Sequence, residues 1–84
     1  MANKSLLELL IRMCKAYDIS QKDIRGHSKR KTLVEARKAF AYSAWIRGAS
    51  MRKIGAVLGN RDSSVIASYI RRVKNINDIL DPRD

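Results

Sequence analysis

Residues 50–66 are Ser-Met-Arg-Lys-Ile-Gly-Ala-Val-Leu-Gly-Asn-Arg-Asp-Ser-Ser-Val-Ile, and they predict two helices joined by a tight turn. Ser50 is a residue type that caps a helix N-terminus, and Gly59 is a type that ends a helix. The apolar residues between them fall at helical spacing and are expected to face the core: Met51, Ile54, Val57 and Leu58. Residues 60–62 form the turn, and Asp62 or Ser63 caps the next helix.

That next helix is predicted to run to about Asn75, with a buried stripe made of Ile66, Tyr69, Ile70 and Val73. Two short helices joined by a glycine-containing turn, the second with a polar and basic free face, are the elements of a helix-turn-helix. Small polar residues at the start of the second helix can approach base edges in the major groove, and capping does not prevent such contacts. The predicted base contacts are Arg61, Asp62, Ser63, Ser64 and Val65.

The segment before residue 50 predicts three more helices. Residues 5–17 show an amphipathic stripe, and Ser5 followed by Glu8 is a capping-box pattern. A short helix is expected between Ser20 and Gly26, and residues 27–31 (His-Ser-Lys-Arg-Lys) are expected to form a basic loop. The third helix is predicted to begin at Thr32, with Glu35 as its capping partner, and to end near Arg47 before Gly48. The stripe of the first helix consists of Leu6, Leu10, Met13, Cys14 and Tyr17.

The chain has 84 residues, which is enough for one small domain with a single core and no large cofactor cavity. The prediction is an all-α domain of about five helices that occupies residues 1–84. Its core covers about 5–75, and 76–84 form a loose tail, because Pro82 prevents useful extension of the last helix.

Positive charge is concentrated in the middle and later part of the chain. Eighteen Lys and Arg against eight Asp and Glu give a net charge of +10, and residues 22–74 alone carry fourteen basic and three acidic residues. Such a field attracts polyanions through counterion release, although net charge also serves solubility. The cations expected to contact phosphate are Arg37, Arg47, Arg52, Lys53 and Arg71.

Other chemistry has little support in the sequence. Cys14 is the only cysteine, so neither an internal disulfide nor a cysteine-histidine zinc site is expected, and residues 6–11 are too short an apolar run to span a membrane. The acids between 22 and 74 are too scattered for a metal-dependent nuclease, and His27 lies among cations. We therefore expect a cytoplasmic protein with no catalytic residue, metal or cofactor.

Residues 54–66 resemble the signature of the C-terminal domain of the bacterial replication initiator DnaA, which usually follows the pattern IGxxFGGRDHTTV. The N-terminal half is also similar. Tyr17-Asp18-Ile19, then Asp23-Ile24, then the basic residues 28–31 match the family's YxI, DL and basic-loop sequence. The resemblance covers roughly residues 6–74, and it implies an initiator-type fold that binds double-stranded DNA.

By position, the resemblance implies that Lys29, Arg30 or Lys31 enters the minor groove while residues 61–64 face the adjacent major groove. The departures from the family pattern include Ser63 in place of His, Val65 in place of the second Thr, and Arg52 in place of Pro. These departures leave DNA binding as the expectation, but the family's usual recognition sequence is not carried over to this chain.

No Gly-rich phosphate loop ending in Lys-Ser/Thr occurs, so ATP hydrolysis by that mechanism is not expected. A complete protein of this kind would be a phage or mobile-element protein, a transcription factor, or a replication regulator that competes at initiator sites. Two alternatives remain open: an RNA-binding protein, and a module that captures a replication protein through the helix at 5–17. The oligomeric state is also open, because one domain can bind alone while a symmetric site requires two.

Overall fold

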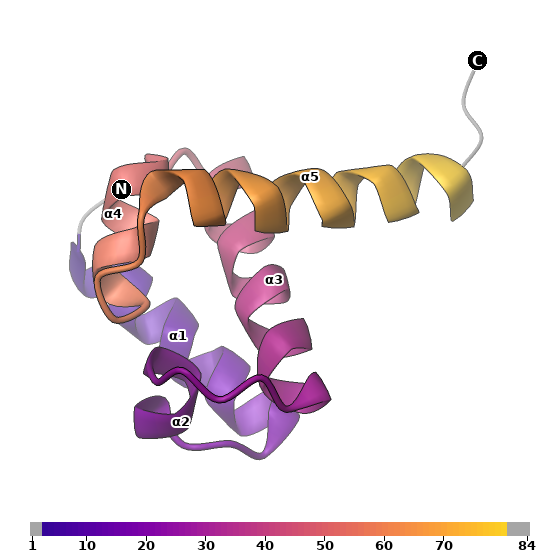
Figure 1. Cartoon of the computed structure of the whole chain (residues 1–84). Helices are drawn as coiled ribbons and strands as arrows, with labels where there is room; N and C mark the ends of the chain where they lie inside the picture. Colours follow the sequence, from indigo (N-terminus) through magenta and orange to yellow (C-terminus); the bar gives the residue numbers. More distant parts are fainter. Residues whose placement is uncertain (1–2, 81–84) are drawn as a thin grey trace.

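The computed structural model describes the backbone of residues 3–80 and the side chains of residues 5–74. This part of the chain is all-helical (Figure 1), with the order α1 (Asn3–Tyr17), α2 (Gln21–Arg25), α3 (Lys31–Ile46), α4 (Met51–Val57) and α5 (Ser63–Leu80). The predicted fold class, an all-α domain of about five helices with a helix-turn-helix, is confirmed.

A single core joins the five helices. α3 packs against each of the other four, and α5 lies across α3 and α4 (Figure 1). The largest fully buried side chains come from every helix or its immediate end: Leu6, Leu10, Ile24, Leu33, Phe40, Ile54, Leu58 and Ile66. Burying each such side chain contributes about 1.5–3 kcal/mol, so the core fixes how α4 and α5 are placed on the rest of the domain.

Serines cap the N-termini of α2 and α4, at the start of the short helix expected between Ser20 and Gly26 and at Ser50, where the sequence predicted a cap. The Ser20 hydroxyl accepts a hydrogen bond from the Asp23 amide at 3.0 Å, and the Ser50 hydroxyl accepts one from the Lys53 amide at 3.2 Å. Each hydroxyl thereby satisfies an amide that has no partner within its helix. The predicted positions of these two short helices are confirmed.

Glycines end α3 and α4 where the sequence predicted. Gly48 has a φ of 98° and Gly59 a φ of 77°, a left-handed conformation that glycine adopts without a steric penalty. After α3 the Gly48 amide donates to Trp45 O at 3.0 Å and the Ala49 amide to Ala44 O at 3.1 Å. These two bonds form a Schellman motif, which satisfies carbonyls at the end of the helix.

Two predicted helix starts are wrong. α1 begins at Asn3, so Ser5 lies inside the helix and is not its cap. α3 begins at Lys31 with Arg30 in the N-cap position and without a side-chain cap, which corrects the prediction that Thr32 caps this helix. The Val34 amide donates to the Arg30 carbonyl at 3.0 Å, so the helix begins with a backbone bond and without a side-chain cap.

α5 also runs further than predicted, to Leu80 instead of about Asn75. No glycine or proline interrupts the sequence between Ser63 and Asp81, so the helical backbone can continue past Asn75. Residues 76–80 of the predicted tail are therefore helical, and residues 81–84 lie outside the described residues.

Candidate nucleic-acid interface

The turn between α4 and α5 is built on close backbone packing. Gly59 and Asn60 both have positive φ, 77° and 62°, and the Arg61 amide then donates to the carbonyl of Gly55 at 2.9 Å. A side chain at Gly55 would collide with the carbonyl oxygen of Arg61. The glycines at 55 and 59 therefore let the chain reverse tightly enough to set α5 directly against α4.

Four polar or small residues are exposed where α5 begins. Asp62 precedes the helix, and its carbonyl accepts from the amides of Val65 and Ile66 at 3.0 and 3.3 Å. Its carboxylate accepts a hydrogen bond from the Ser64 hydroxyl at 2.8 Å. Ser63, Ser64 and Val65 are exposed, whereas Ile66 is fully buried and anchors the helix to the core. The start of α5 thus presents two hydroxyls, one carboxylate and one apolar side chain to an incoming ligand.

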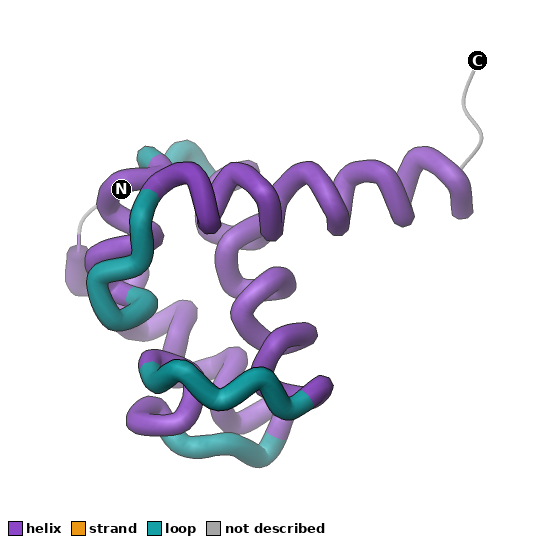
Figure 2. The backbone as a smooth tube through the Cα atoms, in the orientation of Figure 1, coloured by secondary structure: helices purple, strands orange, loops and turns teal. Residues whose placement is uncertain are grey.

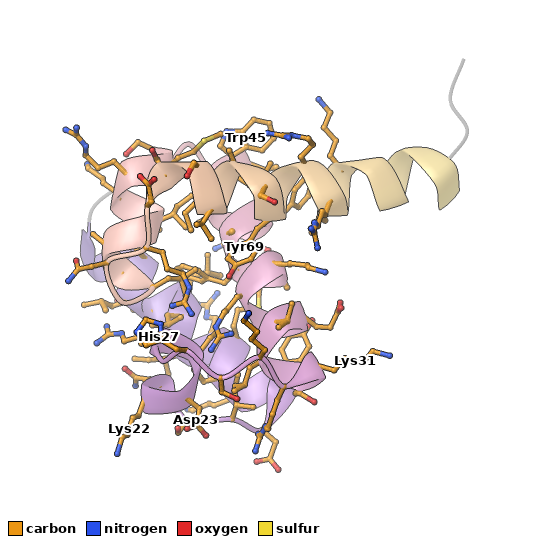
Figure 3. The ribbon with its side chains drawn as sticks, in the orientation of Figure 1. Lys22, Asp23, His27, Lys31, Trp45 and Tyr69 are labelled. Carbon is orange, nitrogen blue, oxygen red and sulfur yellow. The ribbon has the colours of Figure 1, made fainter. Side chains whose placement is uncertain are left out.

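The basic loop, residues 27–31, lies between α2 and α3 and is exposed throughout. Lys31 is already in the first turn of α3 and extends away from the protein (Figure 3). Figure 2 shows that the α2–α3 and α4–α5 connections both lie on the near side of the molecule, with α1 behind them. The structure therefore brings the basic loop and the start of α5 to one face, as an interface with two adjacent grooves would require.

Arg37 is buried, and this burial corrects the prediction that it contacts phosphate. Only 2% of the residue is exposed. Its guanidinium donates to four backbone carbonyls: Ile24 O at 2.8 Å, Ser28 O at 2.6 Å, Asp23 O at 2.9 Å and Gly26 O at 3.0 Å. These bonds satisfy carbonyls at the C-terminus of α2 and within the basic loop, so Arg37 shapes the loop from inside.

Burial lowers the pKa of Arg37, and the positive charge of Arg61 lowers it further. The phenol of Tyr69 acts in the opposite direction. Tyr69 belongs to α5 and lies between that helix and α3 (Figure 3). An arginine keeps its proton under physiological conditions, so the α2 carbonyls face a permanent cation at the negative end of that short helix.

Arg61 also donates to backbone carbonyls. One terminal nitrogen of its guanidinium donates to Leu58 O at 2.6 Å and to Arg25 O at 3.2 Å, and the other donates to Gly26 O. The residue is half-buried. The structure thus uses Arg61 to join the α4–α5 turn to the end of α2, whereas the sequence predicted a base contact for it.

The remaining predicted phosphate contacts are exposed and lie at the end of α3, on α4 and on α5. Arg47 follows α3, Arg52 and Lys53 occupy the first turn of α4, and Arg71 lies on α5. Because these four side chains are exposed, they can contact phosphates of a nucleic-acid backbone without a rearrangement of the core.

The described residues contain no group of three or more metal-ligating side chains and no pocket. His27 is exposed in the basic loop, and burial raises the pKa of the Cys14 thiol. Tyr42 and Trp45 form a tilted aromatic pair with ring centroids 6.3 Å apart. No helix in the described part of the chain is both long and apolar enough to cross a bilayer.

Sequence reasoning missed the roles of Arg37 and Arg61. A signal was available for Arg37, because it lies at helical spacing among the buried residues Leu33, Ala36, Phe40 and Ala41. A cation in an apolar stripe is expected to find partners inside the protein. No comparable signal marks Arg61, whose partners at Arg25 and Gly26 are distant in the chain.

A sequence profile of the family described as bacterial DnaA protein helix-turn-helix matches residues 8–73. Comparison with curated proteins and with solved structures gave no match. The matched segment begins within α1 and reaches the buried stripe of α5, so it includes both the basic loop and the start of α5. The chain therefore belongs to the bacterial DnaA helix-turn-helix family of DNA-binding domains.

Proposed function

We propose that this protein binds double-stranded DNA sequence-specifically, with the basic loop in the minor groove and the start of α5 in the adjacent major groove. The observation that carries the proposal is the placement of the two segments on one face. Lys29, Arg30 and Lys31 supply positive charge there, and residues 62–65 supply hydrogen-bonding groups and a methyl surface. An α-helix fits the major groove, and cations are attracted to the narrower minor groove.

Each exposed group at the start of α5 has a base edge that it can recognise. Ser63 and Ser64 can donate or accept, Asp62 can accept from a cytosine amino group, and Val65 can pack against a thymine methyl. Because Ser64 already donates to Asp62, these two side chains would act together as one polar unit. Arg61 belongs to the proposed interface only as the neighbour of Asp62, because its guanidinium already donates to backbone carbonyls of the protein.

The proposed phosphate contacts are Arg47, Arg52, Lys53 and Arg71, with the basic loop adding further charge. We propose that such binding regulates replication or transcription at sites in the nucleoid, for example by occupying sites of an initiator. A phage or mobile element is one proposed origin of such a regulator.

A second candidate function is capture of a replication protein. Leu7 and Ile11 are 39% and 38% exposed one turn apart on α1, which lies behind the proposed DNA face in Figure 1. An apolar pair at this spacing can contact a partner helix or groove. Leu7 and Ile11 belong to neither the basic loop nor α5, so the two functions would use different residues.

Duplex binding is expected to weaken steeply with salt. With about five phosphate contacts, log K should fall with a slope of about −4.5 against log salt concentration. Fluorescence anisotropy on a labelled duplex measures this slope, with single-stranded DNA, RNA and heparin as competitors. A flat response, or competition by single-stranded DNA, RNA and heparin as strong as that by unlabelled duplex, would contradict the proposal, and tighter binding to RNA would favour the RNA-binding alternative.

Removing the hydroxyls at the start of α5 is expected to change sequence preference more than overall affinity. Ser63→Ala and Ser64→Ala should each alter the ratio of specific to non-specific binding by about 1 kcal/mol or more, because good base contacts discriminate by about 1–3 kcal/mol. The measurement compares a duplex selected from a randomised pool with a scrambled duplex. Ser5→Ala is the matched control, since it removes an exposed hydroxyl from α1. Folded serine variants that keep the parent's full ratio would remove α5 from the proposed role.

A further inference from the structure

Arg61 links the two segments proposed to contact DNA. It follows the α4–α5 turn, immediately before the exposed residues 62–65, and its guanidinium donates to the carbonyls of Arg25 and Gly26 just before the basic loop. A third bond, to Leu58 O at 2.6 Å, fixes the guanidinium to the end of α4. A planar guanidinium with several donors can hold such separate carbonyls in one fixed geometry.

A second contact at the same place confirms how closely the turn approaches α2. A side chain at Gly59 would collide with the Arg25 carbonyl oxygen, the same atom that accepts from Arg61. Arg37 holds the other side of this segment through Gly26 O and Ser28 O. The start of the basic loop is therefore clamped between a cation from α3 and a cation from the turn.

We propose that Arg61 is a positioning residue for DNA recognition, which locks the basic loop and the start of α5 into one surface with fixed spacing and does not contact a base. This inference rests on the proposed function. Minor-groove and major-groove contacts require a set distance between the two segments, and a loop that must become ordered on binding loses affinity through conformational entropy. Arg61 lowers that cost by holding Gly26, where the chain enters the loop, in place before DNA arrives.

Positioning and base contact predict different results for Arg61→Met. A base-contacting arginine would, when lost, relax preference at one position of the site by about tenfold or more. A positioning arginine would, when lost, weaken binding to every sequence by about tenfold, because ordering even one or two loop residues costs that much, and leave the preferred bases unchanged. Arg61→Lys keeps the charge with fewer, undirected donors and should fall between the parent and Arg61→Met.

The experiment has one measurement without DNA and one with it. NMR relaxation of the free protein gives order parameters for the amides of residues 26–30, which should be about 0.85 in the parent and below about 0.6 in Arg61→Met. Binding is then measured against a set of duplexes carrying single changes in the selected site. Arg52→Met is the matched control, because it removes an exposed cation of α4. It should weaken DNA binding without making the basic loop more mobile.

Thermal unfolding establishes whether each variant is folded. If Arg61→Met does not fold, Arg61→Lys takes its place in both measurements. A mobile loop together with a uniform loss of affinity supports the inference. Unchanged order parameters, or a preference relaxed at a single base position, would overturn it while leaving the proposed function intact. A parent protein that prefers no duplex would instead overturn the proposed function, and the inference with it.

Discussion

Gly55→Ala is expected to destabilise the protein by about 2 kcal/mol or more, although alanine is the better helix former. An alanine in a helix interior normally gains about 1 kcal/mol over glycine. Here the added methyl group would collide with the backbone carbonyl oxygen of Arg61, and a backbone atom cannot move aside as a flexible side chain would. Overpacking costs about 1–3 kcal/mol and occasionally more, and a collision with a backbone atom belongs at the upper end of that range, so a net loss of about 2 kcal/mol or more remains after the gain in helix propensity is subtracted.

Thermal unfolding followed by circular dichroism measures this change, with an expected fall in the midpoint of about 10 °C. Ala56→Gly is the matched control, because Ala56 is the exposed neighbour of Gly55 in α4. It isolates helix propensity and should cost about 1 kcal/mol. A loss of stability at both positions is the expected pattern, whereas a more stable Gly55→Ala protein would show that α4 and the turn are not in close contact.

Arg37→Met is expected to lower the free energy of unfolding by about 3 kcal/mol or more. Methionine fills much of the same space but donates no hydrogen bond, so carbonyls at the C-terminus of α2 and in the basic loop lose their donor. Hydrogen bonds to charged groups contribute about 1.5–3 kcal/mol each, and part-buried carbonyls recover some of that from water. The loss is large for a protein whose total stability is on the order of 5–15 kcal/mol.

Urea denaturation gives the free energy of unfolding for Arg37→Met and for two comparison variants. Arg72→Met removes an exposed cation of α5 and should change stability by less than about 0.5 kcal/mol. Arg37→Lys keeps the charge but cannot serve four carbonyls, so it should recover less than half of the loss. If Arg37→Met were as stable as Arg72→Met and merely reduced the salt slope of DNA binding by about one, Arg37 would be a phosphate contact.

The sequence determined those features whose causes lie within a few residues of each other. Ser20, Ser50, Gly48 and Gly59 mark helix ends because their capping bonds and left-handed φ values are local. The helix-turn-helix could be predicted for the same reason, since the residues that cap its two helices and form the turn between them are contained in residues 50–66. Local signals also failed at Ser5 and Thr32, where a plausible cap residue lies inside a helix that starts earlier without using it.

Only the tertiary structure decided which cations are free for a ligand. Arg37 and Arg52 have the same side chain, yet one is 2% exposed and bonded to four carbonyls while the other is on the surface. The partners of Arg37 lie 9 to 14 residues away, and those of Arg61 at the end of α2 lie 35 and 36 residues away. The direction of a backbone carbonyl is set by how the helices pack. Residue type and spacing therefore show where positive charge occurs, but not which cations donate to carbonyls of the protein itself.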